Sequence, residues 1–171
     1  YHRSQFDAYV EVNELFAQEL RSLLEPDDVV WVHDFHLIPL GAELRRAGHA
    51  QRLGFFLHTP LPPFEVLRAL PVHRELLDLL CAYDVVGFQT ERDLSAFRDA
   101  LAQPPIAADI LADGTVRHNG RTVHTGVFPI GVDVDSCARL AVANLHSPQL
   151  DGIRASLRAR QLLIGVDRLD Y

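Results

Sequence analysis

The chain has 171 residues, 48% hydrophobic and 23% charged, and its 16 basic against 23 acidic side chains give a formal net charge of −7. This composition is typical of a chain that buries a core, and the length allows one domain or one domain and the start of another. The acidic balance argues against a nucleic-acid partner, because binding to phosphate backbones requires clustered cations. Neither a membrane helix nor a signal peptide is recognisable, so we expect a soluble, cytoplasmic protein.

Two residue types are absent from the sequence. All 16 basic residues are Arg, and there is neither Lys nor Met. Without Lys, Schiff-base chemistry and a Walker-type phosphate loop are excluded within these residues. The missing initiator Met favours an internal fragment of a longer protein. The two cysteines, Cys81 and Cys137, fit no metal or disulfide spacing, and Cys81 lies in an apolar run where a buried thiol is expected.

The first part of the chain alternates helices and strands. A helix over residues 6–24 is predicted by apolar residues at three- and four-residue spacing. In chain order there follow a strand at 29–32, a helix at 37–47, a strand at 53–57, helices at 64–70 and 73–83, a strand at 85–88 and a helix at 92–102. Thr90 is expected to cap the last helix, with Asp93 at its third position. The pair Arg45 and Arg46 is expected on the polar face of its helix.

The later part opens with a hairpin. Asn119 and Gly120 separate the runs 115–118 and 121–124, a strong signal for a two-residue turn. A separate strand is expected at 127–130, then helices at 135–145 and 148–160, and a last strand at 162–166. Because most strands are unbroken apolar runs between helices, the pattern predicts an α/β fold whose parallel sheet is covered by helices on both faces.

Polar residues follow most of the predicted strands. In open parallel sheets, ligands bind beyond the carboxyl ends of the strands, so these residues predict a polar cleft for a polar ligand. The segments concerned are His33-Asp34, His58-Thr59-Pro60, Gln89-Thr90-Glu91, Gly131 and Asp167-Arg168.

Each of the three main candidates has a functional and a structural interpretation. Asp34 could accept hydrogen bonds from a sugar hydroxyl, or it could cap the following helix. His58 could face the cleft, or it could be a hydrogen-bonded group of the core. Arg168 could bind phosphate in a chain without Lys, or it could pair with a neighbouring acid. A metal site at His33, Asp34 and His36 is conceivable but disfavoured, since no later cluster supplies the remaining ligands.

Five segments resemble the trehalose-6-phosphate synthase family of glycosyltransferases, in the same order. They are W-V-H-D-F-H-L-I-P at 31–39, G-F-F-L-H-T-P-L-P at 54–62, Y-D-V-V-G-F-Q-T at 83–90, P-I-G-V at 129–132 and D-R-L-D-Y at 167–171. The resemblance implies a retaining transferase of two Rossmann-like domains (GT-B) with its active site between them. On that reading, residues 1–133 are the latter part of the N-terminal, acceptor-side domain, and residues 134–171 are a linker and the beginning of the UDP-glucose-binding domain.

The resemblance also implies an activity and roles for three residues. The family transfers glucose from UDP-glucose to glucose-6-phosphate, without a required metal or other cofactor. Asp34 would hydrogen-bond the acceptor sugar, His58 would sit beside the transferred glucose, and Arg168 would bind the donor diphosphate and offset charge on the departing UDP. The expected partners are the small-molecule substrates and, in a possible homo-oligomer, further copies of the chain. Neither nucleic acid nor a membrane is expected as a partner.

Three alternatives stay open on the sequence. A sister transferase such as a glucosylglycerol-phosphate synthase uses another acceptor, and the family's early glycine loop and acceptor-binding Arg have no counterpart in these residues. A non-catalytic, regulatory synthase-like subunit is the second alternative. A metal-dependent hydrolase built on His33, Asp34 and His36 is the third. The 171 residues alone are expected to lack transferase activity.

Overall fold

The computed structural model describes residues 2–104, 106–157 and 160–166. These residues form two compact units, one up to Ile130 and one from Gly131. The assignment of residues 1–133 and 134–171 to two domains of a larger protein stays a prediction. Among the described residues, no helix is both long and apolar enough to cross a bilayer.

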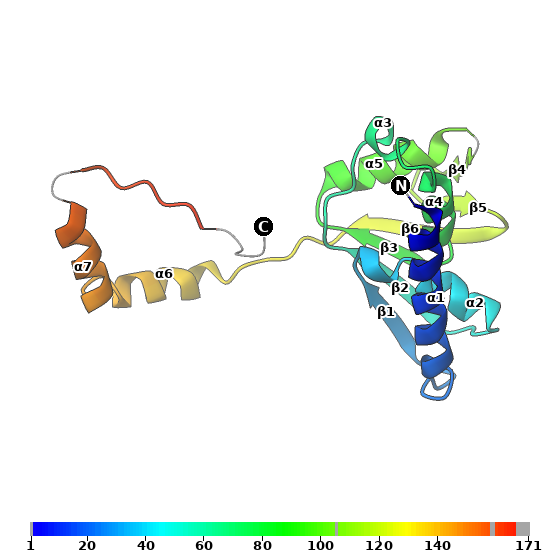
Figure 1. Ribbon diagram of the computed structural model, residues 1–171, viewed down its shortest axis with the longest axis horizontal. Coiled ribbons are helices and arrows are strands. Elements are labelled where there is room, and N and C mark those ends of the chain that lie inside the picture. Colours follow the sequence, from blue (N-terminus) through cyan, green and yellow to red (C-terminus); the bar gives the residue numbers. More distant parts are fainter. Residues whose placement is uncertain (1, 105, 158–159, 167–171) are drawn as a thin grey trace. The chain divides into compact units, whose positions relative to one another are not determined.

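The first unit contains a six-stranded sheet and a layer of helices (Figure 1). Its strands are β1 (Val29–His33), β2 (Arg52–Leu57), β3 (Val85–Phe88), β4 (Asp109–Ile110), β5 (Val116–His118) and β6 (Arg121–Val127). Its helices are α1 (Arg3–Leu20), the 3-10 turn η1 (Phe35–Leu37), α2 (Leu40–Arg46), α3 (Phe64–Leu67), α4 (His73–Leu80) and α5 (Glu91–Ala102).

The strand order is β1-β2-β3-β6-β5-β4. The first four strands in this order run parallel, whereas β4, β5 and β6 pair antiparallel. The α/β class with a parallel-dominated sheet is therefore confirmed. The N-cap of α5 is confirmed as well, because the Asp93 amide donates to the Thr90 hydroxyl at 3.2 Å.

Strand β6 corrects one prediction. The sequence suggested separate strands at 121–124 and 127–130, but a single strand runs over Arg121–Val127. Its first half pairs antiparallel with β5 and its second half parallel with β3, so it joins the hairpin to the parallel sheet. The hairpin itself is confirmed: Asn119 (φ 49°) and Gly120 (φ 75°) both have positive φ, as a type I′ turn requires.

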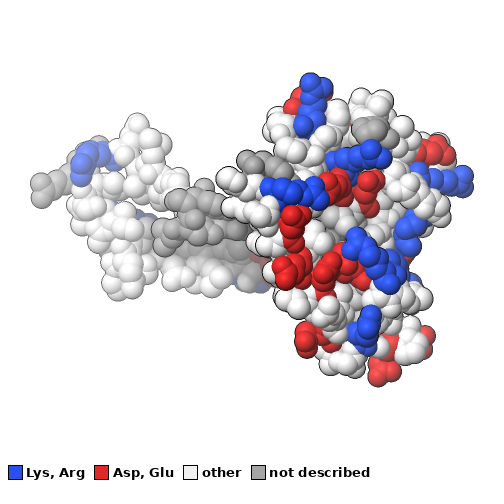
Figure 2. Space-filling model, turned by 45° about the vertical axis from the view of Figure 1, so that its right-hand side comes forward, with Lys and Arg blue, Asp and Glu red and all other residues white. Residues whose placement is uncertain are grey.

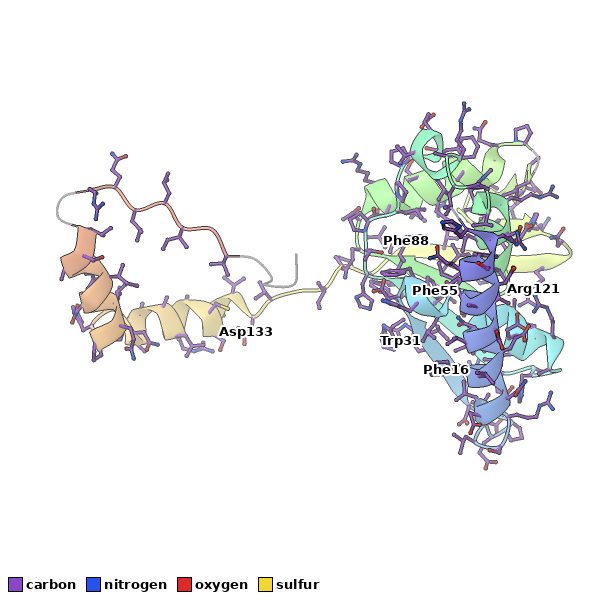
Figure 3. The ribbon with its side chains drawn as sticks, viewed as in Figure 1. Phe16, Trp31, Phe55, Phe88, Arg121 and Asp133 are labelled. Carbon is purple, nitrogen blue, oxygen red and sulfur yellow. The ribbon has the colours of Figure 1, made fainter. Side chains whose placement is uncertain are left out.

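Helices cover only one face of this sheet within the first unit, so the prediction of cover on both faces is wrong for the described residues. Val32, Phe55 and Val86 point to the covered face and are at most 3% exposed. On the opposite face Trp31, labelled in Figure 3, is 66% exposed, and Val85 is 38% exposed. The reason is topological: right-handed crossovers that step repeatedly in one direction, from β1 to β2, β3 and β6, all lie on the same side.

The second unit contains α6 (Val134–Ala143) and α7 (Pro148–Leu157). Asp133 caps α6 by accepting the Ser136 amide at 2.8 Å. The strand predicted at 162–166 is not formed, and residues 160–166 have no regular secondary structure. A strand requires a hydrogen-bonded neighbour, and the described residues of this unit supply none.

Candidate active site

Two imidazoles meet at the carboxyl ends of the first two strands. His33 ends β1 and His58 follows β2, which is its parallel neighbour. The His33 Nδ1 and His58 Nε2 atoms are 2.9 Å apart, and the ring centroids are 5.2 Å apart with 26° between the planes. Both residues are exposed. The prediction that residues after different strands gather at one sheet edge is confirmed for this pair, and His58 is not a core histidine.

Asp34, the next residue after His33, has an unusual backbone. Its φ of 67° and ψ of 165° fall in a region that is essentially restricted to Gly and costs a non-Gly residue about 1–3 kcal/mol. Its side chain makes no cap to η1, so the capping interpretation is wrong. Instead the Oδ1 atom is buried and has no hydrogen-bond partner among the described residues. The strained backbone and the unpaired carboxylate oxygen make Asp34 a candidate for a binding residue.

Helix α1 holds the strained segment from one side. The Tyr9 hydroxyl donates to the Phe35 carbonyl, and the Asn13 Nδ2 donates to the His36 carbonyl at 3.2 Å. Asn13 is completely buried, and burial raises the pKa of Tyr9, which therefore keeps its proton as a donor. These contacts fix the carbonyl groups that follow Asp34. Such fixing is needed because a strained conformation persists only where surrounding contacts hold it in place.

Tyr83 holds the same segment from the other side. Its hydroxyl donates to the Leu37 carbonyl at 2.8 Å and accepts the Gly41 amide at 2.9 Å. The Gly41 amide is one of the N–H groups at the start of α2 that have no partner within the helix. Tyr83 is fully buried, and burial raises its pKa. A side chain on Gly41 would begin 2.5 Å from the Tyr83 ring, so glycine is needed for this close approach.

A groove of 480 Å³ lies on the uncovered face of the sheet and reaches the His33–His58 pair. Added Cβ atoms on Gly87 and Gly126 would lie about 3 Å from the Phe128 ring, so these glycines form a floor on which the ring lies. The predicted polar cleft is corrected here: the lining is mainly aromatic and apolar, with polar groups near one end. The lining residues include Trp31, His33, Gly54, Phe56, His58, Val85, Gly87, Gln89, Phe128 and Ile130.

Asp93 anchors the segment that follows His58, a role that the sequence analysis missed. Its Oδ1 accepts the Leu61 amide at 3.1 Å, and its Oδ2 accepts the Thr90 hydroxyl at 2.6 Å. The residue is only 6% exposed. Asp93 itself was the available signal, because an acid at the third position of a capped helix lies near the preceding loop. The sequence analysis gave Asp93 a role in capping alone.

Another network surrounds Asp84 and corrects the prediction for Arg45. The Asp84 carboxylate accepts Arg45 at 2.7 Å, Arg121 at 2.9 Å and the Leu53 amide at 2.8 Å. The Arg45 side chain is 18% exposed and is not on a solvated helix face. Asp84 precedes β3, so this network lies at the amino ends of the strands and is structural.

A larger groove of 740 Å³ lies along α1, α2 and α4 on the helix layer. Its basic residue Arg3 is paired with acidic residues: it contacts Glu75 at 2.7 Å and Asp7 at 3.0 Å, and the Glu75 hydrogen bond raises the pKa of Arg3. Over the face shown in Figure 2, acidic and basic side chains are interspersed. This pairing favours a solvated surface over a ligand site.

Two hypotheses from the sequence remain, the phosphate-binding role of Arg168 and the metal site at His33, Asp34 and His36. Arg168 lies in 167–171, outside the described residues. Within the described residues, no group of three or more His, Cys, Asp or Glu side chains could hold a metal ion. His33, Asp34 and His36 therefore do not converge as the metal hypothesis requires.

Comparisons with known proteins match the whole chain. The model of the family described as glycosyltransferase family 20 matches residues 1–171. A trehalose-6-phosphate synthase of Sinorhizobium fredii is 46% identical over 171 residues, which are 100% of this chain and 37% of that protein.

Two solved structures extend the match to the fold. The crystal structure of an α,α-trehalose 6-phosphate synthase from Burkholderia multivorans has a TM-score of 0.92 and 42% identity, over 100% of this chain and 37% of that one. A UDP-forming α,α-trehalose-phosphate synthase from Burkholderia xenovorans, solved in complex with glucose-6-phosphate, has a TM-score of 0.85 and 45% identity, over 94% and 36%. The chain thus spans little more than a third of these relatives.

Proposed function

The chain belongs to glycosyltransferase family 20, and on that premise we propose that it acts as part of a UDP-forming trehalose-6-phosphate synthase. The proposed reaction transfers glucose from UDP-glucose to glucose-6-phosphate and gives trehalose-6-phosphate and UDP. The observation that carries the proposal is Asp34, with its Gly-like backbone and its buried, unpaired Oδ1 next to the His33–His58 pair. The glucose-6-phosphate complex of the Burkholderia xenovorans relative supports this choice of acceptor.

Asp34 is proposed to bind the acceptor sugar. A carboxylate offers only acceptor atoms, which match the O–H donors of a hexose. A hydrogen bond to a charged group contributes about 1.5–3 kcal/mol, so losing the charge is expected to weaken acceptor binding by about 10- to 100-fold. The strain at Asp34 is consistent with selection for the position of its carboxylate and not for backbone stability.

His58 and Arg168 are proposed to act on the donor. His58 lies at the groove end and would hydrogen-bond the transferred glucose, while Arg168 would bind the diphosphate and offset its charge. In the proposed step, the bond between glucose C1 and the diphosphate oxygen breaks, and a bond from C1 to the acceptor oxygen forms on the same face. The acceptor proton passes to the departing diphosphate, so no protein nucleophile and no metal are required.

The test is UDP release from UDP-glucose, with and without glucose-6-phosphate, by a protein that contains these residues and spans the length of the relatives. Release that depends on glucose-6-phosphate is the expected result. Release only with glycerol-3-phosphate would favour the sister transferase, and no release from folded protein would favour a regulatory subunit. The 171 residues alone are expected to release no UDP.

A matched pair of variants tests the role of Asp34. Asp34→Asn removes the charge at the proposed acceptor site and is expected to raise the KM for glucose-6-phosphate about 10- to 100-fold, with a smaller effect on the KM for UDP-glucose. Asp99→Asn makes the same change at an exposed position of α5 and is expected to change neither constant. Equal effects from both variants would contradict the assignment. The cytoplasmic location, the absence of a cofactor and the possible homo-oligomer stay predictions.

A further inference from the structure

His33 has no role in the function proposed above, yet its ring is hydrogen-bonded to that of His58. Its Nδ1 is 2.9 Å from the His58 Nε2. The contact joins the last residue of β1 to the residue just after β2, two strands whose register places His33 opposite Phe56. The two rings therefore meet because the sheet sets the positions of both backbones.

The chemistry of this contact constrains the proton on each ring. In a hydrogen bond between two imidazoles, one nitrogen donates and the other accepts, so the accepting ring must be unprotonated at that atom. If His33 Nδ1 donates, the neutral His58 ring carries its proton on Nδ1; if His58 Nε2 donates, His33 Nδ1 is the unprotonated acceptor. Since the contact uses Nε2 of His58, its Nδ1 is the nitrogen left for another partner.

His33 is itself held in place by its neighbours. Its ring centroid lies 4.4 Å from that of Trp31 and 6.4 Å from that of Phe56. Immediately after it, the Asp34 amide donates to the Phe56 carbonyl at 2.8 Å, which ties the end of β1 to β2. His58 also packs edge-on against the Phe56 ring, with centroids 4.8 Å apart, but that contact offers no hydrogen bond, whereas His33 offers His58 one fixed polar partner.

We propose that His33 is a positioning residue that fixes the ring orientation and the tautomer of His58, so that Nδ1 of His58 is presented to the sugar. This inference rests on the proposed function of His58. A net hydrogen-bond contribution of the usual size corresponds to a population change of about 3- to 10-fold. The expected loss on removing the contact is therefore about 3- to 10-fold in kcat, with the KM for glucose-6-phosphate little changed.

Three variants at one position separate the hydrogen bond from simple packing. In His33→Asn the side-chain amide reaches the place of the ring Nδ1, in His33→Gln it reaches the place of Nε2, and in His33→Phe no polar atom remains. The bond uses Nδ1, so His33→Asn is expected to keep most of kcat, while His33→Gln and His33→Phe lose it about 3- to 10-fold. Thermal midpoints measured in parallel identify any variant that is merely unfolded.

A second readout does not depend on activity. Long-range proton–nitrogen NMR spectra report the tautomer of His58, which is expected to be single in the unaltered protein and mixed in His33→Phe. A single His58 tautomer in His33→Phe, or equal kcat values for the Asn, Gln and Phe variants, would overturn the proposal. If the unaltered protein transfers no glucose, the proposed function fails, and the NMR result still decides whether His33 sets the His58 ring.

Discussion

The Asp34 amide donates a hydrogen bond to the Phe56 carbonyl at 2.8 Å, although Asp34 has a φ of 67°. The bond continues the ladder between β1 and β2 by one residue, and the positive φ then turns the chain abruptly into η1. The surroundings enforce this turn, since Tyr9, Asn13 and Tyr83 bind the carbonyl groups that follow. The strain therefore lies at Asp34, where a glycine would adopt the same backbone conformation without it.

Replacing Asp34 by Gly is expected to stabilise the chain while removing the proposed acceptor contact. Relief of strain contributes about 1–3 kcal/mol, and the greater freedom of Gly in the unfolded state offsets about 0.5–1 kcal/mol of this. A net gain of about 1 kcal/mol is expected in urea unfolding. Asp34→Ala keeps the strain and serves as the control. If Asp34→Gly were no more stable than Asp34→Ala, the backbone would not be strained.

The glycines beneath the groove give a second prediction. A Cβ on Gly87 would lie 2.9 Å from both Phe128 and Phe56, whereas a Cβ on Gly54 would lie 3.6 Å from Trp31, which is ordinary contact. Gly87→Ala is therefore expected to cost about 1–3 kcal/mol by overpacking, and Gly54→Ala less than about 1 kcal/mol. Urea unfolding measures both.

A double variant distinguishes overpacking from a general intolerance of side chains in β3. Replacing Phe128 by Ala removes both ring atoms, Cδ2 and Cε2, that lie within 3.3 Å of the added Cβ of Gly87→Ala. The combined variant is expected to lose less unfolding free energy than the two single variants lose together. The difference, which is the coupling energy, is expected to be about 0.5–3 kcal/mol. Strict additivity would show that Phe128 does not set the cost.

The sequence sufficed for the elements whose signals are local. The turn at Asn119, the cap at Thr90 and the apolar strands β1 to β3 each follow from a few neighbouring residues. The strand β6 was divided because its two halves have different partners, one antiparallel and one parallel, which no local pattern reveals. The prediction of helices on both faces failed for a similar reason, because an apolar strand sequence does not indicate on which face of the sheet the connecting helix lies.

The candidate site was predictable in part. The rule that ligands bind beyond parallel strands indicated both His58 and Asp34. The hydrogen bond between His33 and His58 depends on the register of two strands, and the strain at Asp34 depends on contacts from α1 and Tyr83. Arg45 was misplaced because Asp84, 39 residues later, binds it. Such long-range pairs are set by the fold and leave no spacing signal.

Tyr83→Phe tests whether the hydroxyl supports the turn after Asp34. The change keeps the ring in the core but leaves the Gly41 amide and the Leu37 carbonyl without this partner. A loss of about 1–3 kcal/mol is expected in urea unfolding, because buried polar groups then lose their hydrogen bonds. Hydrogen exchange at the Gly41 amide should accelerate by more than at the Phe97 amide in α5. Equal acceleration would indicate only a global loss of stability.

The two cysteines give a further prediction, in which one thiol is the control for the other. Cys81 is buried and Cys137 exposed, and burial raises the pKa of the Cys81 thiol to about 12 from an ordinary value of 9.0. At pH 8 a thiol reagent is therefore expected to modify Cys137 rapidly and Cys81 only after unfolding. Modification of both at similar rates would contradict the burial of Cys81.

The same shift makes stability depend on pH. Between pH 9 and 12 the unfolded thiol loses its proton while the folded thiol keeps it, so the free energy of unfolding falls as the pH rises. The raised pKa leaves the free energy of unfolding unchanged well below pH 9 and lowers it by about 1.4 kcal/mol at pH 10. Cys81→Ala removes this dependence, so its unfolding free energy should fall less than that of the unaltered chain between pH 7 and 10. Parallel curves for the two proteins would show that the Cys81 pKa is not raised.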